Sequence, residues 1–205
     1  MNAKARSAAK RGSKRAPLSA NPDEANPFST TSRKNYGYDP KQVDEFIRRA
    51  RHAYHGDGTM TAAEVRSTSF DAVKGGYTAH QVDQVLDRLE DAFLRTERDE
   101  LIQKQGMETW NTYLDELIRR LMLRLDRPDG ERFRRPSNEE STSYHQQDVD
   151  TLCRKLRGHL TDESSVSVTD LRVVSFRSVQ GSEGYEEGQV DAFIDDAVEL
   201  LTVLD

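Results

Sequence analysis

The sequence predicts a mostly α-helical protein made of four short turn-plus-helix units, arranged in two tandem pairs that a long, coiled-coil-like amphipathic helix joins. Three observations predict this fold class. The string Tyr-x4-Val-Asp occurs four times, and the tyrosines that begin it are Tyr38, Tyr77, Tyr144 and Tyr185. Apolar residues follow each valine at +3, +4, +7 and +11, which is the spacing of one buried helical face. The copies also come in pairs, because equivalent valines such as Val43 and Val149 are 106 residues apart.

Composition is typical of a soluble protein with a small apolar core. Of the 205 residues, 35% are hydrophobic and 32% are charged, whereas about 25% charged residues is usual. No run of 18 apolar residues occurs, and no charged segment leads into an apolar one. We therefore expect a cytoplasmic protein with neither a membrane span nor a secretion signal. The single cysteine, Cys153, excludes a disulfide framework within the chain.

Residues 1–26 are expected to form a disordered basic tail. Residues 1–34 carry eight Lys and Arg against two acidic residues, whereas the whole chain has a net charge of −6. Such a tail could contact anionic lipid, nucleic acid or the acidic remainder of the chain through screened, non-specific attraction.

Residues 27–95 are predicted to be the first double module, in which each long helix begins just after its tyrosine. Pro40 suits the first position of a helix, and Asp39 with Gln42 has the spacing of a capping box. In three copies a glycine precedes the tyrosine, which suits a turn with an unusual backbone angle, and the third copy has Ser143 there. A phenylalanine lies upstream of each tyrosine, and these residues are Phe28, Phe70, Phe133 and Phe176.

Residues 96–127 are predicted to be an amphipathic linker helix, and residues 128–205 the second double module. Counting from Val82 in alternating steps of four and three residues gives a row of positions on one helical face, which we call the seam. The seam is apolar at both ends and polar from 96 to 103. One long helix, or two successive helices with a break near Gly106, would fit this pattern. Its heptad period suits coiled-coil packing.

Capped single turns of helix are expected at 61–65 and 167–171, ahead of the second and fourth tyrosines. The residues that complete the pattern of the second copy are Thr61, Val65, Phe70, Gly76, Tyr77, Val82, Asp83 and Leu86. With this pattern the chain resembles the DivIVA domain family of bacterial division and polar-growth proteins. The resemblance implies a helical dimerisation module that continues into a parallel coiled coil and serves as a scaffold on the inner face of the membrane.

The resemblance also implies a site for a partner peptide. Adaptors of the family hold an arginine of a partner's cytoplasmic peptide with the tyrosine of Gly-Tyr, the aspartate of Val-Asp and an aspartate four residues later. The matching residues are Tyr77, Asp83 and Asp87 in the second copy and Tyr185, Asp191 and Asp195 in the fourth. Two alternatives stay open: these acids complement the helix dipole, or Arg48 and Arg154 of the other copies bind them within the chain.

Membrane contact is expected to depend on basic residues. Scaffolds of the family insert an apolar side chain and an arginine from the loop before Gly-Tyr, but Lys74 and Gly75 stand at those positions here. Contact with the inner membrane surface would therefore fall to Arg33, Lys34, Tyr36, Lys74 and the basic tail.

The sequence contains no recognised catalytic motif, so we expect a protein that is not an enzyme and uses no cofactor or metal. No Walker-type loop, G-x-S-x-G, H-E-x-x-H or cysteine pair occurs. His52 and His55 lie three residues apart but lack a third metal ligand at suitable spacing.

We therefore expect an adaptor or scaffold of bacterial cell division or polar envelope growth, at the septum or pole. Its partners would be division or cell-wall-synthesis proteins, bound through cytoplasmic peptides, and it could form a homo-oligomer. One alternative is a nucleic-acid-associated protein that uses the basic tail. Another is a cytosolic regulatory protein whose repeats pair internally and leave no peptide groove. The sequence leaves open whether the repeats pair within or between chains.

Overall fold

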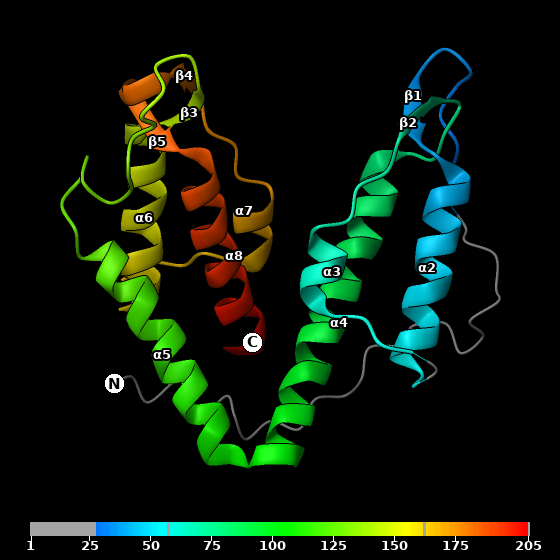
Figure 1. Ribbon diagram of the computed structural model, residues 1–205, viewed down its shortest axis with the longest axis horizontal. Helices are drawn as coiled ribbons and strands as arrows, with labels where there is room; N and C mark the ends of the chain where they lie inside the picture. The colour runs from blue at the N-terminus through cyan, green and yellow to red at the C-terminus, as the bar shows by residue number, and fades with distance from the viewer. Residues whose placement is uncertain (1–27, 57, 162, 205) are drawn as a thin grey trace. The chain divides into compact units, whose positions relative to one another are not determined.

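The structure, a computed structural model, is mostly helical, as the sequence predicts (Figure 1). The residues that it describes are 28–56, 58–161 and 163–204. They form two compact units, which we call the N-terminal unit (28–104) and the C-terminal unit (105–204). The tail predicted at 1–26 lies outside the described residues.

The N-terminal unit contains two long helices, one short helix and two short strands. In chain order these are β1 (Tyr36–Tyr38), α2 (Pro40–Tyr54), α3 (Ala62–Arg66), β2 (Ala72–Lys74) and α4 (Ala79–Gln105). Asp39 caps α2, because its carboxylate accepts a hydrogen bond from the backbone N–H of Lys41 at 2.8 Å. A capping box between Thr61 and Glu64 begins α3, as the sequence predicts.

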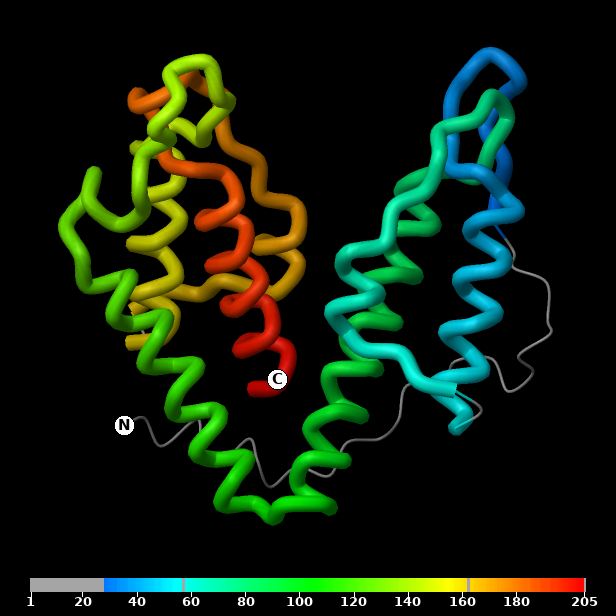
Figure 2. The backbone as a smooth tube through the Cα atoms, viewed as in Figure 1, coloured from blue at the N-terminus to red at the C-terminus, as the bar shows by residue number. Residues whose placement is uncertain are grey.

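The C-terminal unit has the same order of elements after one additional helix, with a 3-10 turn and a third strand added before its last helix (Figure 2). Its elements are α5 (Met107–Leu125), β3 (Thr142–His145), α6 (Gln146–Leu160), α7 (Val168–Arg172), β4 (Ser178–Gln180), the 3-10 turn η1 (Gly181–Glu183), β5 (Gly184–Glu186) and α8 (Glu187–Leu204). The predicted capped turn is α7, which begins with a capping box between Ser167 and Asp170.

Gly106 separates α4 from α5, so the predicted linker segment forms two successive helices. Its φ of 89° lies in the region that favours glycine. α5 packs against α6 and α8 of the C-terminal unit. The apolar end of the predicted seam is therefore part of a core, and its buried residues are Trp110, Leu114, Leu117, Leu121 and Leu125.

Each long helix that follows a repeated tyrosine begins two residues after it and carries the repeated valine as its fourth residue. Val43, Val82, Val149 and Val190 are at most 1% exposed. Apolar residues on the next turns extend this buried face along each helix, among them Ile47, Leu89, Leu156 and Ala197. The buried face is what holds the two long helices of a unit together.

In the N-terminal unit two backbone segments cross at the glycines that precede the tyrosines. β1 pairs antiparallel with β2, and Tyr38 and Tyr77 exchange backbone hydrogen bonds of 3.0 and 2.8 Å. A Cβ atom built on Gly76 would lie 2.5 Å from the carbonyl oxygen of Tyr38, and one on Gly37 would lie 2.3 Å from that of Tyr77. The expected reason for these glycines is therefore wrong. Neither has a positive φ, and both are needed because two backbones approach each other closely.

The C-terminal unit crosses in the same way. β3 pairs antiparallel with both β4 and β5, and Tyr144 lies opposite Tyr185. Ser143 replaces one of the two glycines, and it is fully buried with its hydroxyl donating to the carbonyl oxygen of Gly181 at 2.9 Å. A Cβ atom on Gly184 would lie 2.4 Å from that hydroxyl oxygen, so the serine fits only because glycine faces it.

Candidate functional site

The crossing sends each tyrosine hydroxyl to the helix of the opposite half. Tyr77 precedes α4, yet its hydroxyl donates to Asp44 on α2 at 3.2 Å. Tyr38 precedes α2, and its hydroxyl lies beside Asp83 on α4. Burial and then the charge and hydrogen bond of Asp83 raise the pKa of Tyr38. Each tyrosine thus faces the aspartate that follows the other copy's valine.

The C-terminal unit has the same two contacts. The hydroxyl of Tyr185 donates to Asp150 on α6 at 3.1 Å. Tyr144 lies beside Asp191 on α8, where burial and then this carboxylate raise the pKa of Tyr144 to about 12. We call the four contacts the tyrosine–aspartate pairs, and they are Tyr38–Asp83, Tyr77–Asp44, Tyr144–Asp191 and Tyr185–Asp150.

This geometry regroups the predicted partner site. The sequence analysis grouped Tyr77 with Asp83, and Tyr185 with Asp191, because these residues are neighbours in the chain. In the structure the hydroxyl of each of these two tyrosines donates to an aspartate of the other copy, Tyr77 to Asp44 and Tyr185 to Asp150. The site residues that sequence reasoning missed are Tyr38, Tyr144, Asp44 and Asp150.

Two of the pairs lie on what we call the acidic faces, which are Asp83 with Asp87 on α4 and Asp191 with Asp195 on α8. Asp83 and Asp191 are exposed, whereas Asp87 and Asp195 are partly buried. The two acids of a face are one turn apart, so their charges repel. The helix dipole does not account for the face on α4, because that helix has no acid in its first turn and the dipole's effect falls off beyond it.

A phenylalanine of the opposite half covers each tyrosine ring. The distances between ring centroids are 5.2 Å for Phe28–Tyr77, 5.5 Å for Tyr38–Phe70, 5.3 Å for Phe133–Tyr185 and 5.1 Å for Tyr144–Phe176. The four phenylalanines that the sequence singles out therefore share one role, which is to hold a tyrosine over the helix that it faces.

The residue after each phenylalanine is also fixed in the same way. Its backbone N–H donates to the side chain that precedes a repeated valine, in the contacts Ser29–Gln81, Asp71–Gln42, Arg134–Gln189 and Arg177–Asp148. Hydrogen bonds from the Arg177 side chain hold the pKa of Asp148 well below its usual range. These contacts anchor the segment that enters each tyrosine–aspartate pair.

Arg132 fills one of the pairs. Its Nη1 donates to Asp150 Oδ1 at 2.7 Å and to Asp129 Oδ1 at 2.5 Å, and its backbone N–H donates to the Tyr185 hydroxyl at 3.3 Å. The backbone N–H of Gly130 donates to the other oxygen of Asp150 at 2.8 Å. Arg132, Asp150 and Tyr185 are 5%, 3% and 0% exposed, so this guanidinium is buried against the pair.

The two arginines that the sequence singled out as internal ligands have other partners. Arg48 forms an ion pair with Glu45 on its own helix at 2.6 Å. Arg154 forms an ion pair with Asp129. The structure does place Arg132, one residue before Phe133, at a tyrosine–aspartate pair. The sequence does mark Arg132 as different, because Phe133 follows an arginine and none of the other three repeated phenylalanines does.

The residues expected to contact a membrane gather at one tip of the N-terminal unit. Tyr36 lies opposite Lys74 across the two strands, and the Lys74 ammonium is 5.9 Å from the centre of the Tyr36 ring. Arg33 and Lys34 are exposed in the turn just before β1. Tyr36 is 64% exposed, so the tip combines three cations with an accessible aromatic ring.

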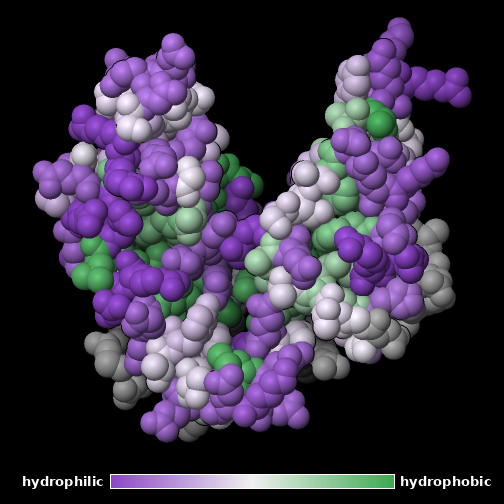
Figure 3. Space-filling model, in the orientation of Figure 1, coloured by the Kyte–Doolittle hydropathy of each residue, from purple (hydrophilic) through white to green (hydrophobic). Residues whose placement is uncertain are grey.

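The matching tip of the C-terminal unit has the opposite charge. Thr142 lies opposite Gln180 there, as Tyr36 lies opposite Lys74. Glu139 and Glu140 stand where the other tip has Arg33 and Lys34, and Glu183 is exposed nearby. In the face that Figure 3 shows, hydrophilic residues cover much of the surface of both units. Of these two tips, the one of the N-terminal unit carries the charge that suits an anionic surface.

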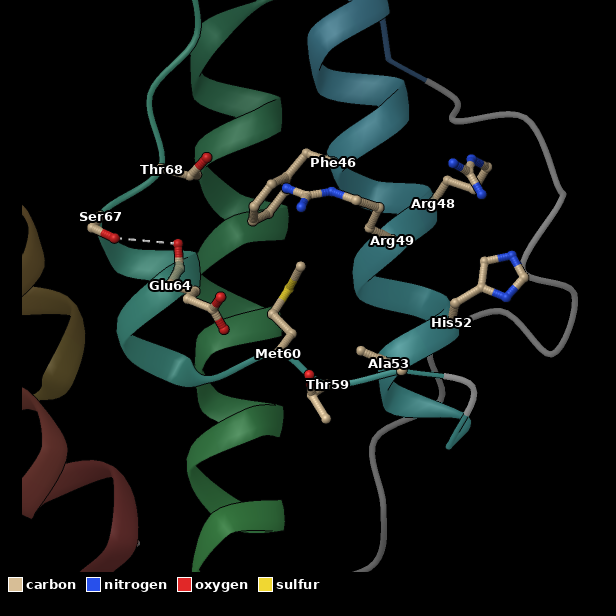
Figure 4. Close-up of a pocket in the computed structure, with 11 residues that line it drawn as sticks. Phe46, Arg48, Arg49, His52, Ala53, Thr59, Met60, Glu64, Ser67 and Thr68 are labelled. Atoms are coloured by element: carbon tan, nitrogen blue, oxygen red, sulfur yellow. Dashed lines mark hydrogen bonds between the residues drawn. The ribbon is translucent and has the colours of Figure 1, made fainter.

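A cavity of about 560 Å³ opens in the N-terminal unit between α2, the segment before α3, and α3 (Figure 4). Arg49 extends across it, 5.5 Å from the centre of the Phe46 ring, whereas Arg48 and His52 point away. The carboxylate of Glu64 caps α3 at its edge. None of the residues predicted for partner or membrane contact lines this cavity.

Comparison with known proteins finds no family model, no curated protein and no solved structure that matches the chain. Within the described part of the chain, no helix is both long and apolar enough to cross a membrane. The same residues contain no group of three or more His, Cys, Asp or Glu side chains that could hold a metal ion.

Proposed function

We propose that the chain is a non-enzymatic adaptor of bacterial cell division or polar envelope growth that binds arginine-bearing segments of partner proteins. In this proposal it consists of four DivIVA-like units in two crossed pairs, joined through the amphipathic, coiled-coil-like segment that forms the end of α4 and α5. The contacts that support it recur four times at the same places in the sequence: tyrosine to aspartate, tyrosine to phenylalanine, and the anchored residue after phenylalanine.

The observation that carries the proposal is the contact of the Arg132 guanidinium with a tyrosine–aspartate pair. A tyrosine–aspartate pair of this protein already holds a guanidinium there, at 2.7 Å from Asp150. The acidic faces present the same pair of groups, an aspartate beside a tyrosine, but with the aspartate exposed. They also add a second acid one turn away, which extends the negative face that an incoming arginine would meet.

Contact with the inner membrane surface is the second part of the proposal. Arg33, Lys34 and Lys74 surround the exposed Tyr36 at the tip of the N-terminal unit. Each basic residue close to an anionic leaflet contributes about 1 kcal/mol, and an interfacial aromatic ring adds to this. Binding of this kind is weak and salt-sensitive, and it would place the acidic faces near cytoplasmic segments of membrane proteins.

A cytosolic regulatory protein is the second candidate, because the copies do pair within each unit. That candidate requires that the crossed pairs leave no site for a partner. The nucleic-acid alternative depends on the basic residues before position 27. Deletion of residues 1–20 distinguishes it from the adaptor proposal. If the deletion abolished binding to DNA or RNA but left the septal or polar position unchanged, the nucleic-acid alternative would be favoured.

The proposal is tested with a fluorescent fusion in dividing cells of the source organism. The wild-type fusion is expected at the septum or poles, and the double variant Asp83→Asn/Asp191→Asn is expected to be diffuse. Asp99→Asn is the matched control, because Asp99 is an exposed acid on α4 that pairs with the adjacent Arg98. A wild-type signal that stays diffuse throughout the cell cycle would contradict the proposal.

A further inference from the structure

We infer that the acidic tip of the C-terminal unit binds the basic tip of a second copy of this chain, so that chains associate head to tail. The basic tip comprises the turn before β1 and the end of β2, and its exposed charges are those of Arg33, Lys34 and Lys74. The acidic tip comprises the turn before β3 and η1, and its exposed charges are those of Glu139, Glu140 and Glu183. This contact lies beyond the proposed function, because it uses no tyrosine–aspartate pair.

The two tips occupy the same place in units that are built alike. β1 pairs with β2 at one tip and β3 pairs with β4 at the other, in the same register once 106 is added to each residue number. At equivalent positions the charge is reversed, because Glu139 and Glu140 stand where the other unit has Arg33 and Lys34. The C-terminal unit also adds η1, which carries a third acid, Glu183. One chain therefore carries two tips of like strand pairing and opposite charge.

The charges of the two tips are not neutralised within their own unit. Among residues 28–56, 58–161 and 163–204, which the structure describes, no side chain forms an ion pair with any of these six. Elsewhere on the surface, exposed charges do pair with neighbours, as Lys104 does with Glu100 at 2.8 Å and Arg119 with Glu116 at 2.5 Å. An ion pair between two tips would therefore displace water but would break no ion pair of the chain itself.

Contacts within each tip orient some of these charges. The carboxylate of Glu139 accepts a hydrogen bond from the Ser182 hydroxyl at 3.2 Å, which holds it beside η1. The Lys74 ammonium lies 5.9 Å from the centre of the Tyr36 ring. Tyr36 is 64% exposed, and tyrosine is a residue type that the interfaces between proteins favour. The basic tip thus offers a second chain an aromatic ring as well as three cations.

The contact is expected to be weak and directional. Each ion pair between exposed side chains stabilises little, because water and salt screen it. Two tips of the same sign repel each other, so only a basic and an acidic tip can meet. Because every chain has one tip of each sign, the contact is heterologous and continues from chain to chain unless it closes into a ring. A second chain would also compete with anionic lipid for the cations of the basic tip.

Sedimentation of the full chain tests this inference through two charge-reversed variants. The basic-tip variant is Arg33→Glu/Lys34→Glu, and the acidic-tip variant is Glu140→Lys/Glu183→Lys, which leaves the contact of Glu139 with Ser182 in place. The mass of the wild type should rise with protein concentration at about 10 mM salt and should stop rising at about 1 M salt. Each variant alone should associate about tenfold more weakly or less, because its two tips now repel.

An equimolar mixture of the two variants should associate again, because the unchanged acidic tip of one can bind the unchanged basic tip of the other. The matched control is Lys104→Glu/Arg119→Glu, which has the net charge of the basic-tip variant but leaves both tips intact, and it should associate as the wild type does. Circular dichroism verifies folding, and Lys34→Glu or Glu140→Lys alone replaces a double variant that does not fold.

Three results would overturn the inference. These are a wild-type mass that stays constant up to about 1 mM protein at low salt, variants that associate as the wild type does, and a mixture that does not recover. Deletion of residues 1–20 should leave association unchanged, and a loss with this deletion alone would assign the acidic tip to the basic tail instead. None of these results bears on the proposed function, since Asp83 and Asp191 are intact in every variant.

Discussion

Replacement of Gly76 by alanine should destabilise the N-terminal unit strongly, because Gly76 lies where two backbones cross. The new Cβ atom would lie 2.5 Å from the carbonyl oxygen of Tyr38 and 2.6 Å from that of Gly37. Both neighbours are backbone atoms, so no side chain can turn aside. The strands must separate, which weakens the 2.8 and 3.0 Å hydrogen bonds between Tyr38 and Tyr77.

The expected cost is about 3–5 kcal/mol. Overpacking of this kind costs about 1–3 kcal/mol, and each backbone hydrogen bond that is lost adds roughly 1 kcal/mol. Since every 1.4 kcal/mol is a factor of ten, amides protected by this unit should exchange about 100-fold faster or more.

Hydrogen exchange followed by mass spectrometry measures this in the full chain, because peptides from α2 and α4 report on the N-terminal unit separately. Gly58→Ala is the matched control within the same unit, since the nearest atom to its new Cβ would be 3.8 Å away. If Gly76→Ala changed exchange no more than Gly58→Ala, the strands would not cross at the distance described here.

Three further predictions concern the charged groups. Asp150→Asn leaves the buried Arg132 with one acid instead of two, and it should lower the free energy of unfolding by about 3 kcal/mol. Urea unfolding measures this through the fluorescence of the single tryptophan, which lies in the same unit. A loss under about 1 kcal/mol would contradict the buried contact of Arg132 with Asp150. Burial and Asp191 raise the pKa of Tyr144 to about 12 in the folded state, against 10.0 in the unfolded state. The stability that this gives is present below pH 10 and is lost as the pH rises towards 12. The free energy of unfolding should therefore fall less steeply with alkaline pH in Tyr144→Phe than in the wild type, and an equal slope would refute this. Arg33→Glu/Lys34→Glu should weaken binding to anionic vesicles by about 30-fold or more in a flotation assay. Charge reversal at the acidic tip of the other unit is the control and should leave binding no weaker. Equal losses at the two tips would contradict the assignment of the membrane-contacting surface.

The helices could be predicted from the sequence because their signals are local. The apolar residues after each valine repeat with the period of a helix, and Pro40 and Thr61 mark where two of the helices begin. The break at Gly106 also followed from one residue type, as one of two alternatives. The short strands could not be predicted, because each has only three or four residues and its partner lies more than 30 residues away in the chain.

The candidate site was predicted in its residue types but not in its grouping. Spacing along the chain assigns Tyr77 to Asp83, whereas the crossing of the backbones assigns it to Asp44. The tertiary pairing of the strands decides which half of a unit a tyrosine side chain contacts, and no local sequence pattern predicts this pairing. Arg132 was missed for the same reason, since its partners Asp150 and Tyr185 are 18 and 53 residues away.

The most direct test of the account is an NMR measurement of where an arginine binds. In the full chain with a synthetic peptide of residues 128–136, whose arginines are Arg132, Arg134 and Arg135, nuclear Overhauser effects are expected from the δ-protons of the peptide's Arg132 to the rings of Tyr38 and Tyr144. The same effects should vanish in the variants that lose Asp83 or Asp191, each at its own tyrosine. Effects to Tyr77 and Tyr185 instead, or to none of the four rings, would contradict the claim that the tyrosine–aspartate pairs on the acidic faces bind a partner's arginine.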